Sequence, residues 1–159
     1  MIRIGHGYDV HAFGGDKPLI LGGVDFPNHI GLVAHSDGDV LLHAVCDSLL
    51  GAASLGDIGY HFPDTDSEFK NADSSDLLAK VNKLIQQNGF FISNIDVTVI
   101  AQTPRLSEHI QSIKSKISTL LSIKADQVNI KATTTESLGY IGRKEGIAVH
   151  SVCLLQSNN

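Results

Sequence analysis

The run GIAVHSVCLL, residues 146–155, is apolar at both alternating sets of positions. Successive side chains of a β-strand point to opposite faces of its sheet, so a strand of this composition is expected to be buried on both faces. Patterns of helical and strand spacing interleave along the rest of the chain. This alternation predicts an α/β or α+β domain in which helices cover one face of a mixed sheet. The pattern leaves open what covers the other face, and the doubly apolar strand favours another subunit.

The other elements follow from local patterns of apolar, glycine and proline residues. Gly22 and Gly23 are expected to form a turn, and Ser36 or Asp37 to cap the first helix. With no internal repeat or linker, residues 1–159 are predicted to form a single domain. The predicted elements are strands at 2–8, 19–23, 95–101 and 128–134, and helices at about 39–53, 74–89 and from 107 onward.

Composition excludes several classes of protein. The net charge is −5, no run of Lys or Arg occurs, and aromatic residues make up only 6%, so nucleic-acid binding is not expected. No apolar segment approaches the ~18 residues that a membrane-spanning helix needs, and no signal or transit peptide is visible. Cys46 and Cys153 lie in apolar segments and are interpreted as core residues of a reduced protein. A cytoplasmic, bacterial-type protein is expected.

The stretch GHGYDVH, residues 5–11, contains the first candidate site. On a strand, Asp9 and His11 share one face, whereas His6 has the opposite parity. On the first predicted helix, a polar ridge of Asp39, His43 and Asp47 has none of the Lys, Glu or Gln typical of a solvated face. Asp9, His11 and His43 together would suit zinc and leave one coordination position open for a substrate.

Four further segments carry chemical groups, and each also has a purely structural interpretation. HSDGD (35–39) would contact an anion or simply cap a helix. GDIGYHFPDTD (56–66) would hold hydroxyls or a second cation, or form an ordinary surface loop. TTTESLGYIGR (133–143) follows a strand, where hydroxyls and Glu136 could meet a ligand or magnesium, although threonine also favours strands. AQTPRL (101–106) would bind a flat ring or form a plain turn.

Taken together, these runs resemble one enzyme family. GHGYDVH, AHSDGDVLLHA, GDIGYHFPDTD, KATTTESLGYIGR and KEGIA are similar, in order and across nearly all 159 residues, to the 2-C-methyl-D-erythritol 2,4-cyclodiphosphate synthases. Three positions depart from the family pattern. Thr103 and Arg105 occupy positions where a small residue and a lysine are common, and Tyr140 replaces a phenylalanine. Arg105 keeps the positive charge.

The resemblance implies a role for each matching residue. Zinc would be held by Asp9, His11 and His43, and a second divalent cation, Mg²⁺ or Mn²⁺, by Glu136. His35 and Thr134 would be catalytic. The implied substrate contacts are Ser36, Asp57, Ile58, Gly59, Phe62, Pro63, Asp64, Thr65, Asp66, Thr133, Thr135, Tyr140 and Arg143. The implied cytidine contacts are Ala101, Gln102, Thr103, Pro104, Arg105, Leu106 and Ser107.

The resemblance also implies the fold, the reaction and the partners. The expected fold is a mixed four-stranded sheet with helices on one face, three copies of which pack around a threefold axis and form active sites between subunits. The implied substrate is 4-diphosphocytidyl-2-C-methyl-D-erythritol 2-phosphate, whose 2-phosphate displaces CMP and closes a cyclic diphosphate. An axial cavity, next to Arg143 and His150, would hold an isoprenoid diphosphate.

Two rival functions have to be distinguished from this one. A zinc hydrolase or phosphodiesterase would use a metal-bound hydroxide and release an opened monophosphate. A noncatalytic metal-binding or ligand-binding trimer would bind CMP and turn nothing over.

Overall fold

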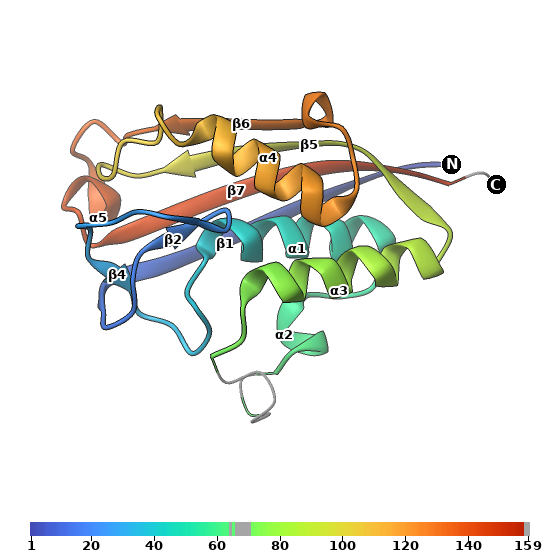
Figure 1. The fold of residues 1–159 in the computed structure, drawn as a ribbon, viewed down its shortest axis with the longest axis horizontal. Helices are drawn as coiled ribbons and strands as arrows, with labels where there is room; N and C mark the ends of the chain where they lie inside the picture. The colour runs from blue at the N-terminus through green and yellow to red at the C-terminus, as the bar shows by residue number, and fades with distance from the viewer. Residues whose placement is uncertain (64, 66–70, 158–159) are drawn as a thin grey trace.

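The computed structural model of the chain describes residues 1–63, 65 and 71–157. This part of the chain contains a five-stranded mixed sheet with the strand order β4-β1-β7-β5-β6 (Figure 1). Only β5 and β6 run parallel to each other, and the other neighbours are antiparallel. The strands are β1 (Ile2–Gly15), β4 (Gly31–Leu32), β5 (Phe90–Ile100), β6 (Val128–Thr133) and β7 (Gly146–Ser157).

The expectation of four strands is therefore corrected to five. The additional strand, β4, has two residues and pairs with the end of β1, where Phe13 lies opposite Leu32. Two residues are too short for an alternating pattern to be recognised in the sequence.

Helices α1 (Val40–Ala53), α3 (Ser74–Gln87) and α4 (Ile110–Leu121) cover one face of this sheet (Figure 1). Helix α1 packs on β1 and β7, α4 packs on β6, and α3 packs against both helices. Fully buried aliphatic residues of α1 and of the sheet form the core between these layers. The shorter elements are the hairpin β2 (Ile20–Leu21) and β3 (Val24–Asp25), α2 (Ile58–His61), a 3-10 turn (Ala125–Gln127) and α5 (Gly139–Gly142).

Several predicted boundaries were wrong. The first strand continues beyond residue 8 to Gly15, because its second half pairs with both β7 and β4. The side chain that caps α1 belongs to Asp39, which accepts a hydrogen bond from Leu42 N. Ser36 and Asp37 instead bond Gly38 N and Asp39 N in the preceding turn. Helix α4 begins at Ile110, after a turn, and not at Ser107.

Two glycines of GHGYDVH allow α1 to lie unusually close to β1. A Cβ atom built on Gly5 would come within 1.9 Å of the Ser48 carbonyl oxygen, and one on Gly7 within 1.9 Å of the Ala44 carbonyl oxygen. Because these contacts are with backbone atoms of the helix, no side-chain rotation could relieve them. The close packing brings residues of α1 next to those of β1 that follow the glycines.

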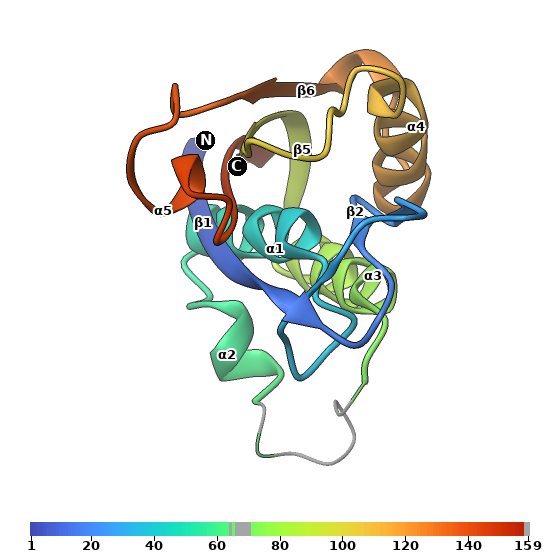
Figure 2. The same cartoon turned by 90° about the vertical axis from the view of Figure 1, so that its left-hand side faces the viewer.

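The face of the sheet opposite the long helices exposes a row of apolar side chains. Ile2, Ile4, Tyr8 and Val10 of β1 and Val152 of β7 each have between 41% and 73% of their surface exposed. The short helix α5 lies on this side, where the Tyr140 hydroxyl is 2.9 Å from that of Tyr8. Figure 2 shows α5 beside β1, apart from α3 and α4. Strand β7, by contrast, is buried on its helix side at Val149, Ser151 and Cys153.

Both cysteines are free and buried, as the sequence predicted. Among the described residues, no helix is long and apolar enough to cross a membrane.

Candidate functional site

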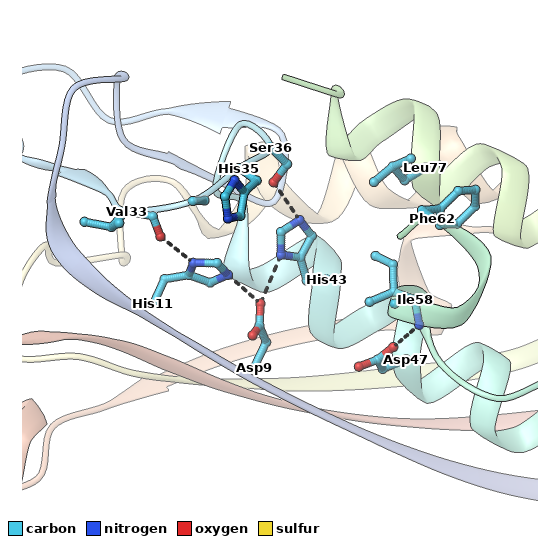
Figure 3. Close-up of a pocket in the computed structure, with 12 residues that line it drawn as sticks. Asp9, His11, Val33, His35, Ser36, His43, Asp47, Ile58, Phe62 and Leu77 are labelled. Atoms are coloured by element: carbon cyan, nitrogen blue, oxygen red, sulfur yellow. Dashed lines mark hydrogen bonds and ion pairs between the residues drawn. The ribbon is translucent and has the colours of Figure 1, made fainter. Parts of the chain in front are cut away.

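Asp9, His11 and His43 converge in the structure. Each offers one potential ligand atom, and these atoms all lie within 4.8 Å of one another. Asp9 Oδ2 is 3.0 Å from His11 Nε2 and 3.0 Å from His43 Nδ1. Asp9 and His11 extend from the helix side of β1, and His43 comes from the first turns of α1 (Figure 3). His6 lies on the opposite face, where its Nε2 is 2.9 Å from His150 Nδ1. The parity prediction is confirmed for all three β1 residues.

The potential ligand atoms of Asp9, His11 and His43 suit a divalent cation. His11 Nδ1 lies 2.8 Å from the Val33 carbonyl oxygen, which can only accept, so in the neutral imidazole Nδ1 carries the proton. Its Nε2 then presents a lone pair toward the Asp9 carboxylate. Two groups that both accept hydrogen bonds approach to 3.0 Å only if a cation lies with them, either a proton or a metal ion. A carboxylate with two imidazoles is a common zinc ligand set.

The charge of Asp9 agrees with this interpretation. Burial alone would raise the pKa of Asp9, but without a metal ion the imidazoles of His11 and His43, when protonated, donate to the carboxylate, outweigh burial and lower its pKa to about 2. The carboxyl group is therefore ionised at neutral pH and can serve as an anionic ligand.

The ligand group opens into a cavity of about 490 Å³. One side is formed by the loop before α1, and the other by α1, α2 and α3 (Figure 3). The lining combines charged and polar groups with the apolar side chains of Val33, Ile58, Phe62 and Leu77, which is typical of small-molecule sites. The lining residues are Asp9, His11, Val33, Ala34, His35, Ser36, His43, Asp47, Ile58, Gly59, Phe62 and Leu77.

The loop that contains His35 and Ser36 forms one wall of this cavity, as its anion-binding interpretation requires. The Ser36 hydroxyl lies 3.3 Å from His43 Nε2. Lys17 donates a hydrogen bond to the Ser36 carbonyl oxygen and a longer one, at 3.4 Å, to that of His35. The ammonium group therefore fixes this loop and places a positive charge behind it.

The segment GDIGYHFPDTD is divided by the structure. Ile58, Gly59 and Phe62 line the cavity. Asp57 instead caps α2, where its carboxylate accepts a hydrogen bond from Tyr60 N at 2.8 Å. Pro63 and Thr65 are described by the structure but do not line the cavity. Asp64 and Asp66 lie outside the described residues.

The predicted nucleotide segment and the threonine turn form a second group, away from this cavity. Ala101 N donates to the Thr133 carbonyl oxygen at 3.0 Å, and Thr135 N donates to Gln102 Oε1 at 3.0 Å. The Thr134 hydroxyl donates to Glu136 at 3.1 Å, so that carboxylate faces its own turn. Of the rest of the segment, Pro104 and Leu106 are buried, Thr103 is partly buried, and Arg105 and Ser107 are exposed.

These two groups lie at the same end of the sheet but on different strands. His11 on β1 is paired with Ile147 of β7, and Ile100 at the end of β5 is paired with the next residue, Ala148. Strand β7 therefore lies between the two groups of residues. On the sides away from β7, strand β1 pairs with β4 and strand β5 pairs with β6. Within one chain the second group contributes no lining residue to the cavity of the first.

Tyr140 and Arg143 do not line the metal-ligand cavity of the single chain. Tyr140 lines a cavity of about 370 Å³ on the open face of the sheet, together with Thr135, Tyr8, Ala148 and His150. Arg143 does not line this cavity, and its Nε donates to Glu145 at 2.6 Å. The hydrogen bond that Arg143 donates to Glu145 raises the pKa of Arg143 further, so the guanidinium is charged.

Sequence reasoning missed several residues of the metal-ligand cavity. Asp47 was noticed only as part of the polar ridge, yet its carboxylate lines the cavity and accepts a hydrogen bond from Ile58 N at 2.8 Å. Burial raises the pKa of Asp47 above its usual value. Asp39, from the same ridge, is fully buried and bonds Gly22 N and Gly23 N. Leu77 and Ser74 come from α3, whose contact with the site has no sequence signal.

Comparison with known proteins gives a consistent result. The model of the YgbB family matches residues 2–156. A 2-C-methyl-D-erythritol 2,4-cyclodiphosphate synthase of Shewanella woodyi is 60% identical over 154 residues, which are 97% of each chain. The structure of a bifunctional IspDF from Campylobacter jejuni is 49% identical with a TM-score of 0.96, and the match covers 100% of this chain and 43% of that one.

A second solved structure, the CDP complex of IspF from Plasmodium falciparum, has a TM-score of 0.86 and 39% identity, and the match covers 99% of this chain and 97% of that one. The family model and these relatives extend over nearly the whole chain, including the residues of both groups described above. The chain therefore belongs to the YgbB family.

Proposed function

We propose that this chain is a 2-C-methyl-D-erythritol 2,4-cyclodiphosphate synthase, a lyase that forms the cyclic diphosphate from 4-diphosphocytidyl-2-C-methyl-D-erythritol 2-phosphate and releases CMP. The family match and the names of relatives about 60% identical support this activity. The observation that carries it is the convergence of Asp9, His11 and His43 in the lining of a cavity of about 490 Å³. In the proposed reaction an oxygen of the 2-phosphate bonds to the β-phosphorus, and the bond from that phosphorus to the bridging oxygen breaks. CMP leaves with this oxygen and its electron pair.

The residues of the cavity suit this chemistry. The nucleophile is already an anionic phosphate, so no strong general base is required. The chain has to bring two anions together and hold a flexible substrate in a shape that can cyclise. A divalent ion held by Asp9, His11 and His43, which we propose to be zinc, would neutralise phosphate charge and align the phosphate groups. His35 and Ser36 would donate hydrogen bonds to phosphate oxygens, and Ile58, Gly59 and Phe62 would contact the methylerythritol carbon chain.

The second group of residues would bind the nucleotide half of the substrate. We assign the cytidine to the segment from Ala101 to Ser107, and phosphate contacts to the adjacent threonine turn, in which Thr134 would stabilise the phosphorus centre. Glu136 would hold a second divalent cation, Mg²⁺ or Mn²⁺, since carboxylate oxygen is the ligand such ions prefer. The remaining proposed substrate contacts are Asp57, Pro63, Asp64, Thr65, Asp66, Thr133, Thr135, Tyr140 and Arg143.

The separation of the two groups supports an active site shared between subunits of a homotrimer. In one chain the nucleotide group lies across β7 from the metal-ligand cavity. The apolar row on β1 and β7 leaves a large hydrophobic surface exposed, which is typical of a protein interface. On β5 and β6 the same face of the sheet carries polar groups, including the ion pair of Asp96 and Lys131 at 2.5 Å. Packing of these faces around a threefold axis would bury the row and bring one chain's nucleotide group to the next chain's cavity.

An isoprenoid diphosphate is proposed for the cavity next to Tyr140 and His150. Its volume of about 370 Å³ and its mainly apolar lining on the open face support an apolar ligand with a polar end. The imidazole of His150, which lies 4.8 Å from the ring of Tyr8, would meet the diphosphate end. A cytoplasmic location for the protein stays a prediction.

The direct test is to follow the substrate by phosphorus NMR with purified protein, zinc and magnesium. Cyclic diphosphate and CMP should appear in equal amounts. His43→Ala should lose most bound zinc and nearly all turnover, because one of three protein ligands is gone. His29→Ala is the matched control, since His29 is exposed and does not line the cavity.

Other outcomes point to the rival functions. An opened monophosphate would identify a hydrolase, and CMP binding without turnover would identify a noncatalytic binding protein. Stoichiometric zinc in purified His43→Ala would exclude His43 as a ligand.

A further inference from the structure

The imidazole of His43 is held on the side away from Asp9 by a residue of another helix. Its Nε2 lies 2.9 Å from the hydroxyl oxygen of Ser74, the first residue of α3. Ser74 is fully buried, so water does not compete for this hydroxyl. The Ser36 hydroxyl is a more distant partner of the same nitrogen, at 3.3 Å.

The direction of this hydrogen bond follows from the next partner. The Ser74 hydroxyl lies 2.5 Å from Asp37 Oδ1, and the Ser74 backbone N–H donates to Asp37 Oδ2 at 2.9 Å. Asp37 Oδ1 also accepts from Asp39 N at 3.1 Å. A carboxylate that accepts all these bonds has no proton to donate, so the Ser74 hydroxyl must donate to Asp37. That hydroxyl has only one proton, and its oxygen can therefore only accept from His43.

This chain of hydrogen bonds determines the tautomer of His43. Nε2 must carry the proton, which leaves the lone pair of Nδ1 directed at Asp9 Oδ2, 3.0 Å away. A neutral imidazole binds a metal through the nitrogen that lacks a proton, and the partner of its other nitrogen sets which one that is. The same argument made Nε2 the ligand atom of His11, because its Nδ1 donates to Val33 O.

We propose that Ser74 and Asp37 are positioning residues of the metal site, which hold His43 as the Nε2–H tautomer with Nδ1 as its ligand atom. The inference rests on the proposed metal role of His43. It adds a dependence of that site on the start of α3, which supplies Ser74, and on the loop before α1, which supplies Asp37. It also leaves the Ser36 hydroxyl, which accepts from Gly38 N, able to donate its own proton to a substrate phosphate.

Two substitutions and one control test the proposal through zinc binding, measured by competition with a chromophoric chelator. Ser74→Ala removes the acceptor of Nε2–H and should weaken zinc binding by about 10- to 100-fold, as changes at partners of metal ligands do. Asp37→Asn places an amide where a carboxylate accepted, so the Ser74 hydroxyl can turn toward His43 Nε2 and favour the wrong tautomer. Ser75→Ala is the control, because Ser75 is the neighbouring buried serine of α3 and does not line the cavity.

The tautomer itself gives a second readout that general damage to the fold would not move. Proton–nitrogen correlation spectra of metal-free protein, with ¹⁵N-labelled histidine, should show a proton on His43 Nε2 in the parent and in Ser75→Ala, whether or not Nδ1 also carries a proton toward Asp9. They should show a gain of the Nδ1–H form in Asp37→Asn. The double variant should have about the same zinc affinity as whichever single variant binds zinc more weakly. Both substitutions interrupt the same series of hydrogen bonds, from Asp37 through Ser74 to His43, so their effects should not add.

Parent-like zinc affinity in Ser74→Ala, or an unchanged tautomer in Asp37→Asn, would overturn the inference. Neither measurement uses the substrate. If the parent protein formed no cyclic product, the proposed reaction would be refuted while the zinc and NMR results still decided this proposal.

Discussion

The close approach of α1 to β1 makes a prediction about Gly7. In Gly7→Ala the new Cβ would lie 1.9 Å from the Ala44 carbonyl oxygen and 2.7 Å from Ser48 N. Ordinary contacts begin at 3.4 Å, so helix and strand must separate by about 3.4 − 1.9 = 1.5 Å along that direction. Overpacking a core typically lowers the free energy of unfolding by about 1–3 kcal/mol. We expect a loss at the upper end of this range, because the new Cβ meets backbone atoms that cannot rotate away.

The same displacement should also weaken the metal site. Asp9 follows Gly7 on β1, and His43 precedes Ala44 on α1, so a wider gap between strand and helix separates the two ligands. Metal–ligand distances tolerate only about 0.2 Å of change. We therefore expect Gly7→Ala to unfold at lower urea concentration, with about 3 kcal/mol less stability, and to bind zinc at least about tenfold more weakly.

The control for this experiment is Gly51→Ala in the same helix. A Cβ at Gly51 would meet nothing nearer than the His6 carbonyl oxygen at 3.9 Å. Alanine is a better helix former than glycine, so the free energy of unfolding of Gly51→Ala should be higher than that of the parent by roughly 0.5–1 kcal/mol. Urea unfolding followed by circular dichroism at one protein concentration, with zinc competition on the same samples, compares the two. If Gly7→Ala kept the parent's stability and zinc affinity, the idea that these glycines set the geometry of the site would be wrong.

Three other predictions concern groups outside the metal-ligand cavity. Glu136→Gln should keep its zinc content and bind CMP but turn over much more slowly, because the amide lacks the charge that holds the second cation; near-normal turnover by phosphorus NMR would refute this role. The pKa of Asp96 is lowered by its hydrogen bond to Lys131, so its ion pair stabilises the fold above pH ~3.9 and is lost as pH falls through the lowered value. Carboxyl NMR titration should show that low midpoint, and Lys131→Met should raise it toward normal. Finally, His150→Glu should weaken the binding of geranyl diphosphate, because a carboxylate in the cavity would repel the diphosphate; equal affinities of the parent and the variant by calorimetry would contradict the proposed cavity ligand.

Local patterns in the sequence were sufficient to predict most of the architecture. Long helices and strands are recognised in a sequence because apolar residues recur about every 3.6 and every 2 positions, respectively. Strand β7, which is apolar at both alternating sets of positions, lies in the middle of the sheet. Parity alone separated His6 from Asp9 and His11, because alternation on a strand is a property of the backbone. The same reasoning missed β4 and the true cap of α1, since a two-residue strand has no period and neighbouring polar residues compete for one cap.

The assembly of the site depended on tertiary structure. Two residues of β1 and one of α1 meet because Gly5 and Gly7 let the helix approach, a function of glycine that a spacing pattern does not distinguish from a turn. The contribution of Ser74 comes from a helix that begins 31 residues after His43, and no periodicity connects the two. The orientation of a ring nitrogen is decided by its hydrogen-bond partner in space. The sequence by itself therefore determined which residue types could bind a metal and on which face they lie, whereas only the packing of α1 and α3 against β1 decided how close they come and which nitrogen faces the ion.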